Sequence, residues 1–287
     1  MEKEKPKDPN IYEYDDYRAF LRDYYDTKKK TKKIFSFRYF SRVAGFQSPN
    51  LLKRVMEGER NLTPKSIRKF CKALNFDFDQ SEFYRNLVHF NQAKTFKEKQ
   101  NYAKKLTSFA DYMKIKPGAK TQFEYWSEWF NPIVYELVGL KGFKEDPNWI
   151  ANTLEPSITP SEASRSLKQL EEIGLLKRDE NGQLVQDKFH IFAHDGVVSA
   201  SILHFHREMI SRARESLDRF KQKDRFITNM TFSIEEAEMN EIKFMMEKFN
   251  NDLIEKIQQA KRGSRVFQIN FQAFPLTQPA LSGNYNE

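Results

Sequence analysis

The side chains with the clearest chemistry lie between positions 36 and 65 and are basic or amide-bearing. Lys and Arg can donate hydrogen bonds to guanine O6 and N7, and Asn or Gln can pair with adenine. The candidates for contact with base edges are Gln47, Ser48, Asn50, Leu51, Lys53 and Arg54. The candidates for contact with phosphates are Arg38, Arg42, Arg60, Asn61 and Lys65. This pattern predicts an interface for double-stranded DNA.

The positive charge of the chain is concentrated in the same stretch. The 287 residues include 48 Lys and Arg and 40 Asp and Glu, a net charge of +8. Residues 28–73 alone hold 14 basic and 2 acidic residues. A solvated basic face is one explanation, and an electrostatic footprint for a phosphate backbone is the other. The polar pattern described above favours the second.

Other kinds of chemistry find little support in the sequence. The histidines at 190, 194, 204 and 206 fit no metal-ligand spacing, so we expect them to be surface or hydrogen-bonded residues. Cys71 is the single cysteine of the sequence, which excludes a disulfide framework, and it lies on the apolar side of a predicted helix. Phosphate-binding glycine loops and hydrolase motifs do not occur. We expect no enzymatic activity, no metal and no cofactor.

Five helices in the first 92 residues are predicted to position these side chains. The first runs over 12–25, and Ser36 caps a second that ends at Gly45. Ser48, followed by Pro49, is predicted to cap a helix over 48–57, whose N-terminal amides would also face phosphate. Thr63-Pro64 opens the fourth helix, and Asp79 with Glu82 forms a capping box for the fifth. Residues 37–62 thus have the order of a helix-turn-helix.

A second module is predicted over 121–192, after a linker over 93–120 that could be helical. Helices are expected to begin at Asn131, Asp146 and Thr159, followed by a type I′ hairpin at Asn181-Gly182. Three helices and a hairpin are the winged-helix order. Residues 111–195 hold 10 basic and 14 acidic residues, so we expect a packing or dimerisation module and leave open whether it touches DNA.

The last region, 193–287, is predicted to be an α/β dimerisation or sensing region with a small sheet. A helix over 197–220 precedes a strand over 226–232, and a long helix capped by Ser233 precedes an alternating strand over 267–273. A strand, a crossover helix and a strand imply a parallel pair, which a partner chain could extend. The predicted class is mainly α. With no signal peptide or membrane span, the expected location is the cytoplasm, at the nucleoid.

Two resemblances accompany these patterns. Gly58-Glu59-Arg60-Asn61-Leu62 stands where the repressor/Cro-type helix-turn-helix family has its loop after the recognition helix. Together with this unit, residues 87–93 (LVHFNQA) and 268–276 (QINFQAFPL) resemble a bacterial family of presumed transcriptional regulators, common in predatory and fibre-degrading bacteria. The C-terminal half of that family is a domain of unknown function. The resemblance implies a regulator and supplies no operator.

The sequence therefore predicts a transcriptional regulator that binds specific double-stranded DNA, with the helix over 48–57 in the major groove. A homodimer would place two such helices about 34 Å apart. One alternative is a protein-interaction adaptor that keeps the helix-turn-helix fold without binding DNA. An RNA-binding protein is a weaker alternative, because the sequence indicates no exposed aromatic platform. An effector or a protein partner is left open.

Overall fold

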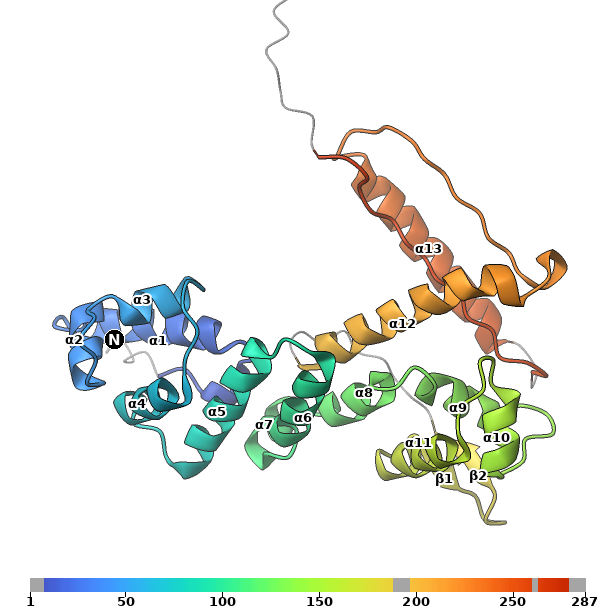
Figure 1. The fold of residues 1–287 in the computed structure, drawn as a ribbon, viewed down its shortest axis with the longest axis horizontal. Coiled ribbons are helices and arrows are strands. Elements are labelled where there is room, and N and C mark those ends of the chain that lie inside the picture. The colour runs from blue at the N-terminus through green and yellow to red at the C-terminus, as the bar shows by residue number, and fades with distance from the viewer. Residues whose placement is uncertain (1–7, 188–196, 260–262, 279–287) are drawn as a thin grey trace, which may run out of the picture.

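The computed structural model describes residues 8–187, 197–259 and 263–278. These residues form thirteen α-helices, two 3-10 helices (Ile11–Glu13 and Gln222–Asp224) and one antiparallel sheet of two short strands. The predicted mainly α class with a small sheet is confirmed. The described part is elongated, with the first helices at one end and the strands at the other (Figure 1). Within it, no helix combines the length and the apolar character that crossing a bilayer requires.

Five helices make up the N-terminal part, as predicted, and side-chain caps explain where most of them begin. Ser36 and Thr63 accept hydrogen bonds from main-chain amides three residues on, which confirms both predicted caps. The predicted capping box of Asp79 and Glu82 is wrong, because Asp77 and Gln80 form it. The helices are α1 (Tyr17–Thr31), α2 (Phe37–Val43), α3 (Leu51–Met56), α4 (Pro64–Leu74) and α5 (Phe78–Gln92).

Aromatic side chains fill the core that these helices enclose. Tyr17, Phe20, Phe70, Phe83 and Tyr84 are all fully buried. Phe20 lies 6.3 Å from Tyr84 between ring centroids, and other rings meet edge to face around it. Buried aromatic pairs of this kind contribute about 0.5–1.5 kcal/mol each beyond the area they bury. The core therefore gives α2 and α3 a rigid support.

The range predicted as a linker, 93–120, contains helices and joins this core. Ala103, Leu106 and Tyr112 are buried against the N-terminal helices. Phe123 belongs to the same core, whereas Tyr125, two residues later, belongs to a second one. The helices here are α6 (Phe96–Leu106), α7 (Ala110–Ile115) and α8 (Ala119–Trp126). The last of them therefore joins the two cores.

The second core contains three helices followed by a hairpin, in the predicted order. The elements are α9 (Asn131–Val138), α10 (Pro147–Thr153), α11 (Pro160–Glu172), β1 (Leu176–Arg178) and β2 (Leu184–Gln186). The predicted type I′ turn is wrong, because only Gly182 has a positive φ, at 75°. The Asp179 carboxylate accepts hydrogen bonds from the amides of Asn181 and Gln183, which favours a longer loop with one left-handed residue.

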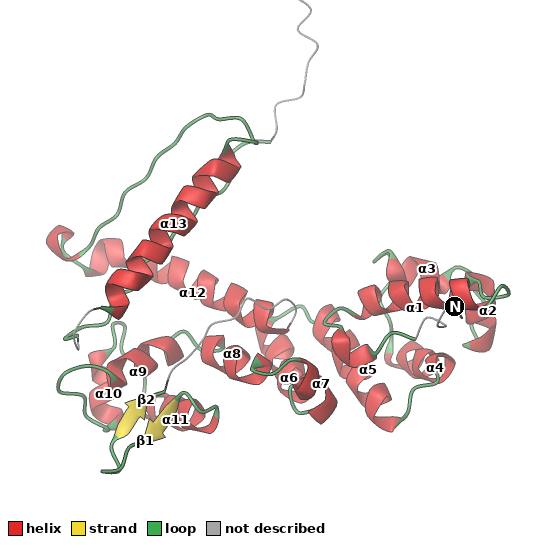
Figure 2. Cartoon of the chain, turned by 180° about the vertical axis from the view of Figure 1, so that it is seen from behind, coloured by secondary structure: helices red, strands yellow, loops and turns green. Residues whose placement is uncertain are grey.

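A long helix, α12 (Val197–Arg219), lies along α6 and α8 (Figure 2). Val198 is buried in the N-terminal core, and Phe205 packs against Trp126 with 4.6 Å between ring centroids. Further along α12, the Arg212 guanidinium lies 3.6 Å from the centre of the Trp129 ring. Contacts of this helix with both cores tie the two parts of the molecule together.

The C-terminal region differs from its prediction. The segments 226–232 and 267–273, predicted as strands, form no strand and are extended and largely exposed. An isolated extended segment gains no ladder hydrogen bonds, and its own chain offers neither segment a partner here. The long helix is present as α13 (Met239–Gln258), but Ser233 does not cap it, since it begins after a turn at 235–238. In both views α13 rises away from the rest (Figures 1 and 2).

Candidate nucleic-acid interface

The helix predicted to read bases, α3, is shorter than expected and is held by side chains from α1. It covers residues 51–56, whereas the prediction was 48–57 with Ser48 as the cap. Residues 48–50 turn instead, because the Ser41 hydroxyl of α2 donates to the Pro49 carbonyl at 3.2 Å. A helix of six residues aligns few peptide dipoles. The predicted phosphate contact through its N-terminal amides is therefore not supported.

Two arginines of α1 bind the C-terminal end of α3. Arg18 donates through Nε to the Val55 carbonyl at 3.1 Å, and Arg22 donates to the Met56 carbonyl at 2.8 Å. The last carbonyls of a helix lack partners within the helix and attract cations. Arg18 and Arg22 therefore fix the direction of α3, a role that sequence reasoning missed. Helical periodicity places both residues on a polar face, and nothing local identifies their partners.

The loop after α3 is clamped by the end of α5. The Gln92 amide group donates to the Leu62 carbonyl at 2.9 Å, and its oxygen accepts from the Leu62 amide at 2.7 Å. Its neighbour Asn91 bridges the start of α1 in the same way, between the Tyr17 amide and the Asp15 carbonyl. Both residues belong to the segment 87–93 that carries the family resemblance. The structure gives that segment a physical role, which is to hold the loop after α3 and the start of α1.

Five of the six predicted base-contacting residues are exposed around α3: Gln47, Ser48, Asn50, Lys53 and Arg54. Leu51 is a correction, because its side chain is only 9% exposed and packs in the N-terminal core. Two carboxylates lie close to the basic pair. Lys53 Nζ is 3.7 Å from Glu57, and Arg54 Nε is 3.1 Å from Glu59. Exposed pairs of this kind are weak and would yield to a phosphate or a base.

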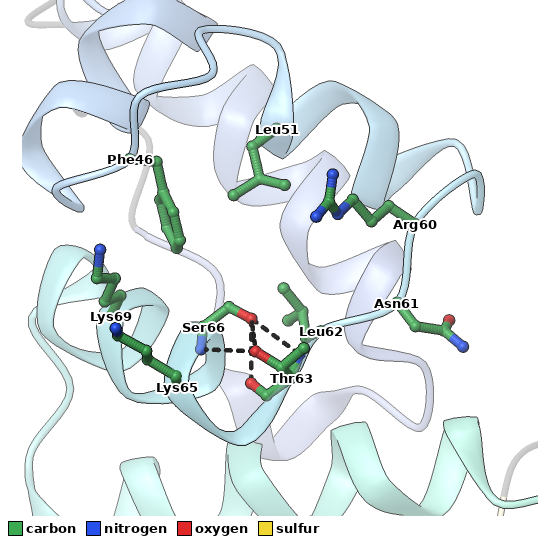
Figure 3. A pocket seen from close by; sticks show the side chains of 9 residues that line it. All are labelled: Phe46, Leu51, Arg60, Asn61, Leu62, Thr63, Lys65, Ser66 and Lys69. Carbon is green, nitrogen blue, oxygen red and sulfur yellow. Dashed lines mark hydrogen bonds between the residues drawn. The ribbon is translucent and has the colours of Figure 1, made fainter.

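The five predicted phosphate-contacting residues line two hollows on either side of Phe46. Arg38 and Arg42 line a hollow of about 320 Å³ together with Gln47. Arg60, Asn61 and Lys65 line the other, of about 180 Å³. Figure 3 shows Lys65 and Lys69 on one side of the second hollow, with Arg60 on the other side. Asn61 is not free, since its side-chain oxygen accepts from Arg18 at 2.6 Å.

Lys69 was absent from the prediction. Its ammonium donates to the Gly45 carbonyl at 2.5 Å and lies 4.7 Å from the centre of the Phe46 ring. The contact ties α4 to the turn between α2 and α3. Its place four residues after Lys65, on the same helical face, is the signal that could have identified it.

The four basic side chains of α11 and β1 are all paired with carboxylates. This holds for every Lys and Arg from 160 to 187, a stretch that lies wholly within the described residues. Arg178 forms a bidentate pair with Glu145, with N–O distances of 2.7 and 3.1 Å. The other pairs are Arg165 with Glu128, Lys168 with Glu172 and Lys177 with Asp187. Residues 160–187 hold 4 basic and 6 acidic residues, and this acidic excess makes the surface poorly suited to neutralising phosphates.

The remaining side chains singled out in the sequence are the histidines and Cys71, and the structure describes the environment of three of them. His204 stacks on Phe96 with 3.7 Å between ring centroids, and burial lowers the pKa of its imidazole. His206 is exposed, while His190 and His194 lie outside the described residues. Cys71 is 8% exposed, which confirms its predicted place in the core, and burial raises the pKa of its thiol.

Comparison with known proteins gives a match for the C-terminal part of the chain. No curated protein and no solved structure matches the sequence. The match begins at residue 110, so it includes α7 to α13 and leaves out residues 37–62, which were predicted to form a helix-turn-helix. Residues 110–276, more than half of the chain, match the family described as "Domain of unknown function (DUF4423)", and the chain belongs to that family.

Proposed function

We propose that this protein is a transcriptional regulator that binds specific sequences of double-stranded DNA through its N-terminal helices. The exposed side chains around α3 would contact base edges, and the cations of the two hollows would contact phosphates on either side. The protein would act in the cytoplasm at the nucleoid, as a homodimer with two such heads. We assign the DUF4423 part no contact with bases.

The observation that carries the proposal is the grouping of the cations. Four side chains from three segments, Arg38, Arg42, Arg60 and Lys65, line two hollows that flank α3. Among the described residues, no carboxylate lies within ion-pair distance of any of these four. By contrast, the basic side chains of α11 and β1 are all paired. Unpaired cations release counterions from DNA at no internal cost, which favours phosphate binding at this end of the molecule.

The test is binding of fluorescent duplexes to the full chain. Selection from random duplexes provides a preferred sequence, and its affinity is compared with that of an unrelated duplex. Because several phosphates are contacted, raising the salt from 50 to 200 mM is expected to weaken binding about 10-fold or more. The double variant Lys53→Ala, Arg54→Ala is expected to lose about 1–3 kcal/mol of discrimination. Lys65→Ala is expected to weaken all duplexes alike.

A matched control comes from the second module. The double variant Arg165→Ala, Lys168→Ala removes two cations from α11 and is expected to leave the affinity unchanged. Failure of the wild-type chain to bind any duplex at 50 mM salt would refute the proposal. Equal loss of affinity in the α3 and α11 variants would also contradict it, because it would mean that only total charge matters.

A second candidate function is that of a protein-interaction adaptor. The pairing of Lys53 with Glu57 and of Arg54 with Glu59 favours it, because the two central basic side chains of α3 are already partly neutralised. An adaptor would show no salt-dependent affinity for duplex DNA. The same titration therefore separates the two functions.

A further inference from the structure

The C-terminal arm, which we define as residues 226–276, exposes a large apolar surface. Of the 22 exposed large apolar side chains in the described structure, 15 lie in this arm and three more lie on α12. In the arm they include seven phenylalanines, of which Phe226 is 88% exposed and Phe244 is 68% exposed. Monomers rarely leave contiguous apolar patches above about 300–600 Å² uncovered.

The helix of the arm lacks the packing that would stabilise it. None of the 20 residues of α13 is buried. In proteins most of the stability of a helix comes from the packing of an amphipathic face, which α13 lacks here. The arm is nevertheless attached at its base, where the Lys141 amide donates to the Gly263 carbonyl at 3.0 Å and the Asn270 amide group donates to the Met209 carbonyl at 3.1 Å. Its exposure is therefore not that of a loose tail.

The two extended segments of the arm also lack partners. Within the described residues, neither 226–232 nor 267–273 takes part in a main-chain hydrogen bond to another main-chain group. Both segments carry exposed apolar side chains, and extended apolar segments with unpaired amides pair readily with another chain. The arm thus offers a helix face and strand edges to the same partner.

The helix α12 presents a second exposed apolar surface. Leu203, Ile210 and Leu217, seven residues apart, are about half exposed on the face that does not touch α8. Arg207 and Arg214 lie on the same face and are exposed. Helix α12 holds 4 basic and 3 acidic residues, and the arm, residues 226–276, holds 6 basic and 7 acidic residues. The arm and α12 therefore differ little in net charge, and both expose large apolar side chains.

These features point to a second copy of this chain as the partner. In a twofold dimer each copy supplies both surfaces, so a single arrangement covers the two arms and the two α12 stripes together. If each of the seven phenylalanines of the arm buried half of the area typical of a buried aromatic side chain, together they would bury about 700 Å² per chain. A standard interface buries about 800 Å² per partner. The other apolar side chains of the arm bring the area into the range of a stable dimer.

We propose that the arm of each copy packs against the exposed face of α12 in the other copy, forming the dimer interface. This assignment deepens the homodimer of the proposed function, and its test uses no DNA. In sedimentation experiments the wild-type chain is expected to be a dimer. The double variant Phe244→Glu, Phe249→Glu is expected to dimerise at least about 30-fold more weakly, as for central interface side chains. The control Phe78→Glu alters a phenylalanine on α5 that is also exposed, at 79%, and this variant should remain dimeric.

A charge exchange tests which surfaces meet. One variant reverses two charges on α12 (Arg207→Glu, Arg214→Glu). The other variant reverses two charges on the arm (Glu241→Lys, Glu247→Lys). Each variant alone would face two repulsive contacts and is expected to be mainly monomeric. An equimolar mixture would restore both contacts in one heterodimer and is expected to sediment as a dimer. All substituted side chains are exposed, so circular dichroism should be unchanged.

The outcomes separate this proposal from the proposed function. A wild-type chain that stays monomeric at its highest soluble concentration would overturn the interface and the homodimer, while DNA binding by the head would be judged by its own titration. A dimer that survives Phe244→Glu, Phe249→Glu would overturn the interface alone. A mixture of the charge variants that is no more dimeric than its components would also overturn the interface.

Discussion

At the scale of single residues, the side chains that position α3 and the loop after it differ from those predicted to contact DNA. Gln92 and Arg18 contact main-chain atoms of residues 30 and 37 positions away in the sequence. Each satisfies groups that a helix end or a loop leaves without partners. Changes at these residues are expected to act on DNA binding through the placement of α3, without removing any contact to DNA.

Gln92→Ala tests this role. It removes both hydrogen bonds to Leu62, whose side chain is 3% exposed, and one to the Tyr17 hydroxyl at 2.9 Å. Part-buried groups left without partners cost about 1–3 kcal/mol. We expect a loss of that size in the free energy of unfolding, measured by urea denaturation, together with weaker binding of the preferred duplex.

The control for Gln92→Ala is Gln100→Ala on α6, a half-buried glutamine for which the structure shows no side-chain hydrogen bond. Its free energy of unfolding should change by less than about 0.5 kcal/mol. Equal losses in the two variants would mean that the clamp on Leu62 contributes nothing.

At the scale of elements, two helices begin with the same kind of cap in different parts of the chain. Thr63 caps α4, which carries Lys65, and Thr159 caps α11. Both form capping boxes, with Ser66 and Glu162 respectively. Replacing either threonine removes the same kind of cap, so the two substitutions differ only in where the helix lies in the molecule.

Thr63→Ala and Thr159→Ala are each expected to lower the free energy of unfolding by about 1 kcal/mol. Only Thr63→Ala is expected to weaken DNA binding, because it loosens the start of α4 beside the smaller hollow. Thermal unfolding and duplex titration of both variants provide the check. Weaker binding in the Thr159→Ala variant would bring the second module into the DNA interface.

At the scale of the whole molecule, α8 and α12 connect the two cores, and a buried carboxylate lies at the junction. Glu124 of α8 is 8% exposed, and its side chain accepts a hydrogen bond from Gln169 of α11. Burial raises the pKa of Glu124, and nearby Lys104 and Lys120 offset only part of this effect. The folded state therefore favours the protonated form of Glu124 more than the unfolded state does.

The sign of the resulting pH dependence follows from linkage. Where the folded-state pKa of an acid is raised, the stabilisation is complete below the unfolded pKa and is lost as the pH rises through the folded pKa. Glu124→Gln is expected to remove this loss, so it should stabilise the protein at neutral pH and leave stability at pH 4 nearly unchanged. Urea denaturation at both pH values measures this difference.

Glu98 provides the contrast, because a hydrogen bond from the Thr95 amide lowers the pKa of its carboxyl. For such a group the stabilisation is present at neutral pH and is lost as the pH falls. Glu98→Gln should therefore lower stability at neutral pH. The same response in both variants would contradict the assignment at Glu124.

The sequence by itself determined the elements that depend on neighbours a few residues apart. Caps at Ser36, Thr63 and Thr159 and the apolar periodicity of the helices are local, so the five N-terminal helices and the three-helix and hairpin order could be predicted. Ten of the eleven predicted contact residues are exposed, and the exception is Leu51.

Only the tertiary structure decided what depends on distant neighbours. The start of α3 follows from the hydrogen bond between Ser41 and Pro49, and its direction follows from α1. The apolar and β-forming residues of 226–232 and the alternating apolar residues of 267–273 predicted strands, but a strand exists only where another strand completes its hydrogen bonds. The sequence contains the side chains that favour such pairing, whereas the presence of a partner is a property of the assembled molecule.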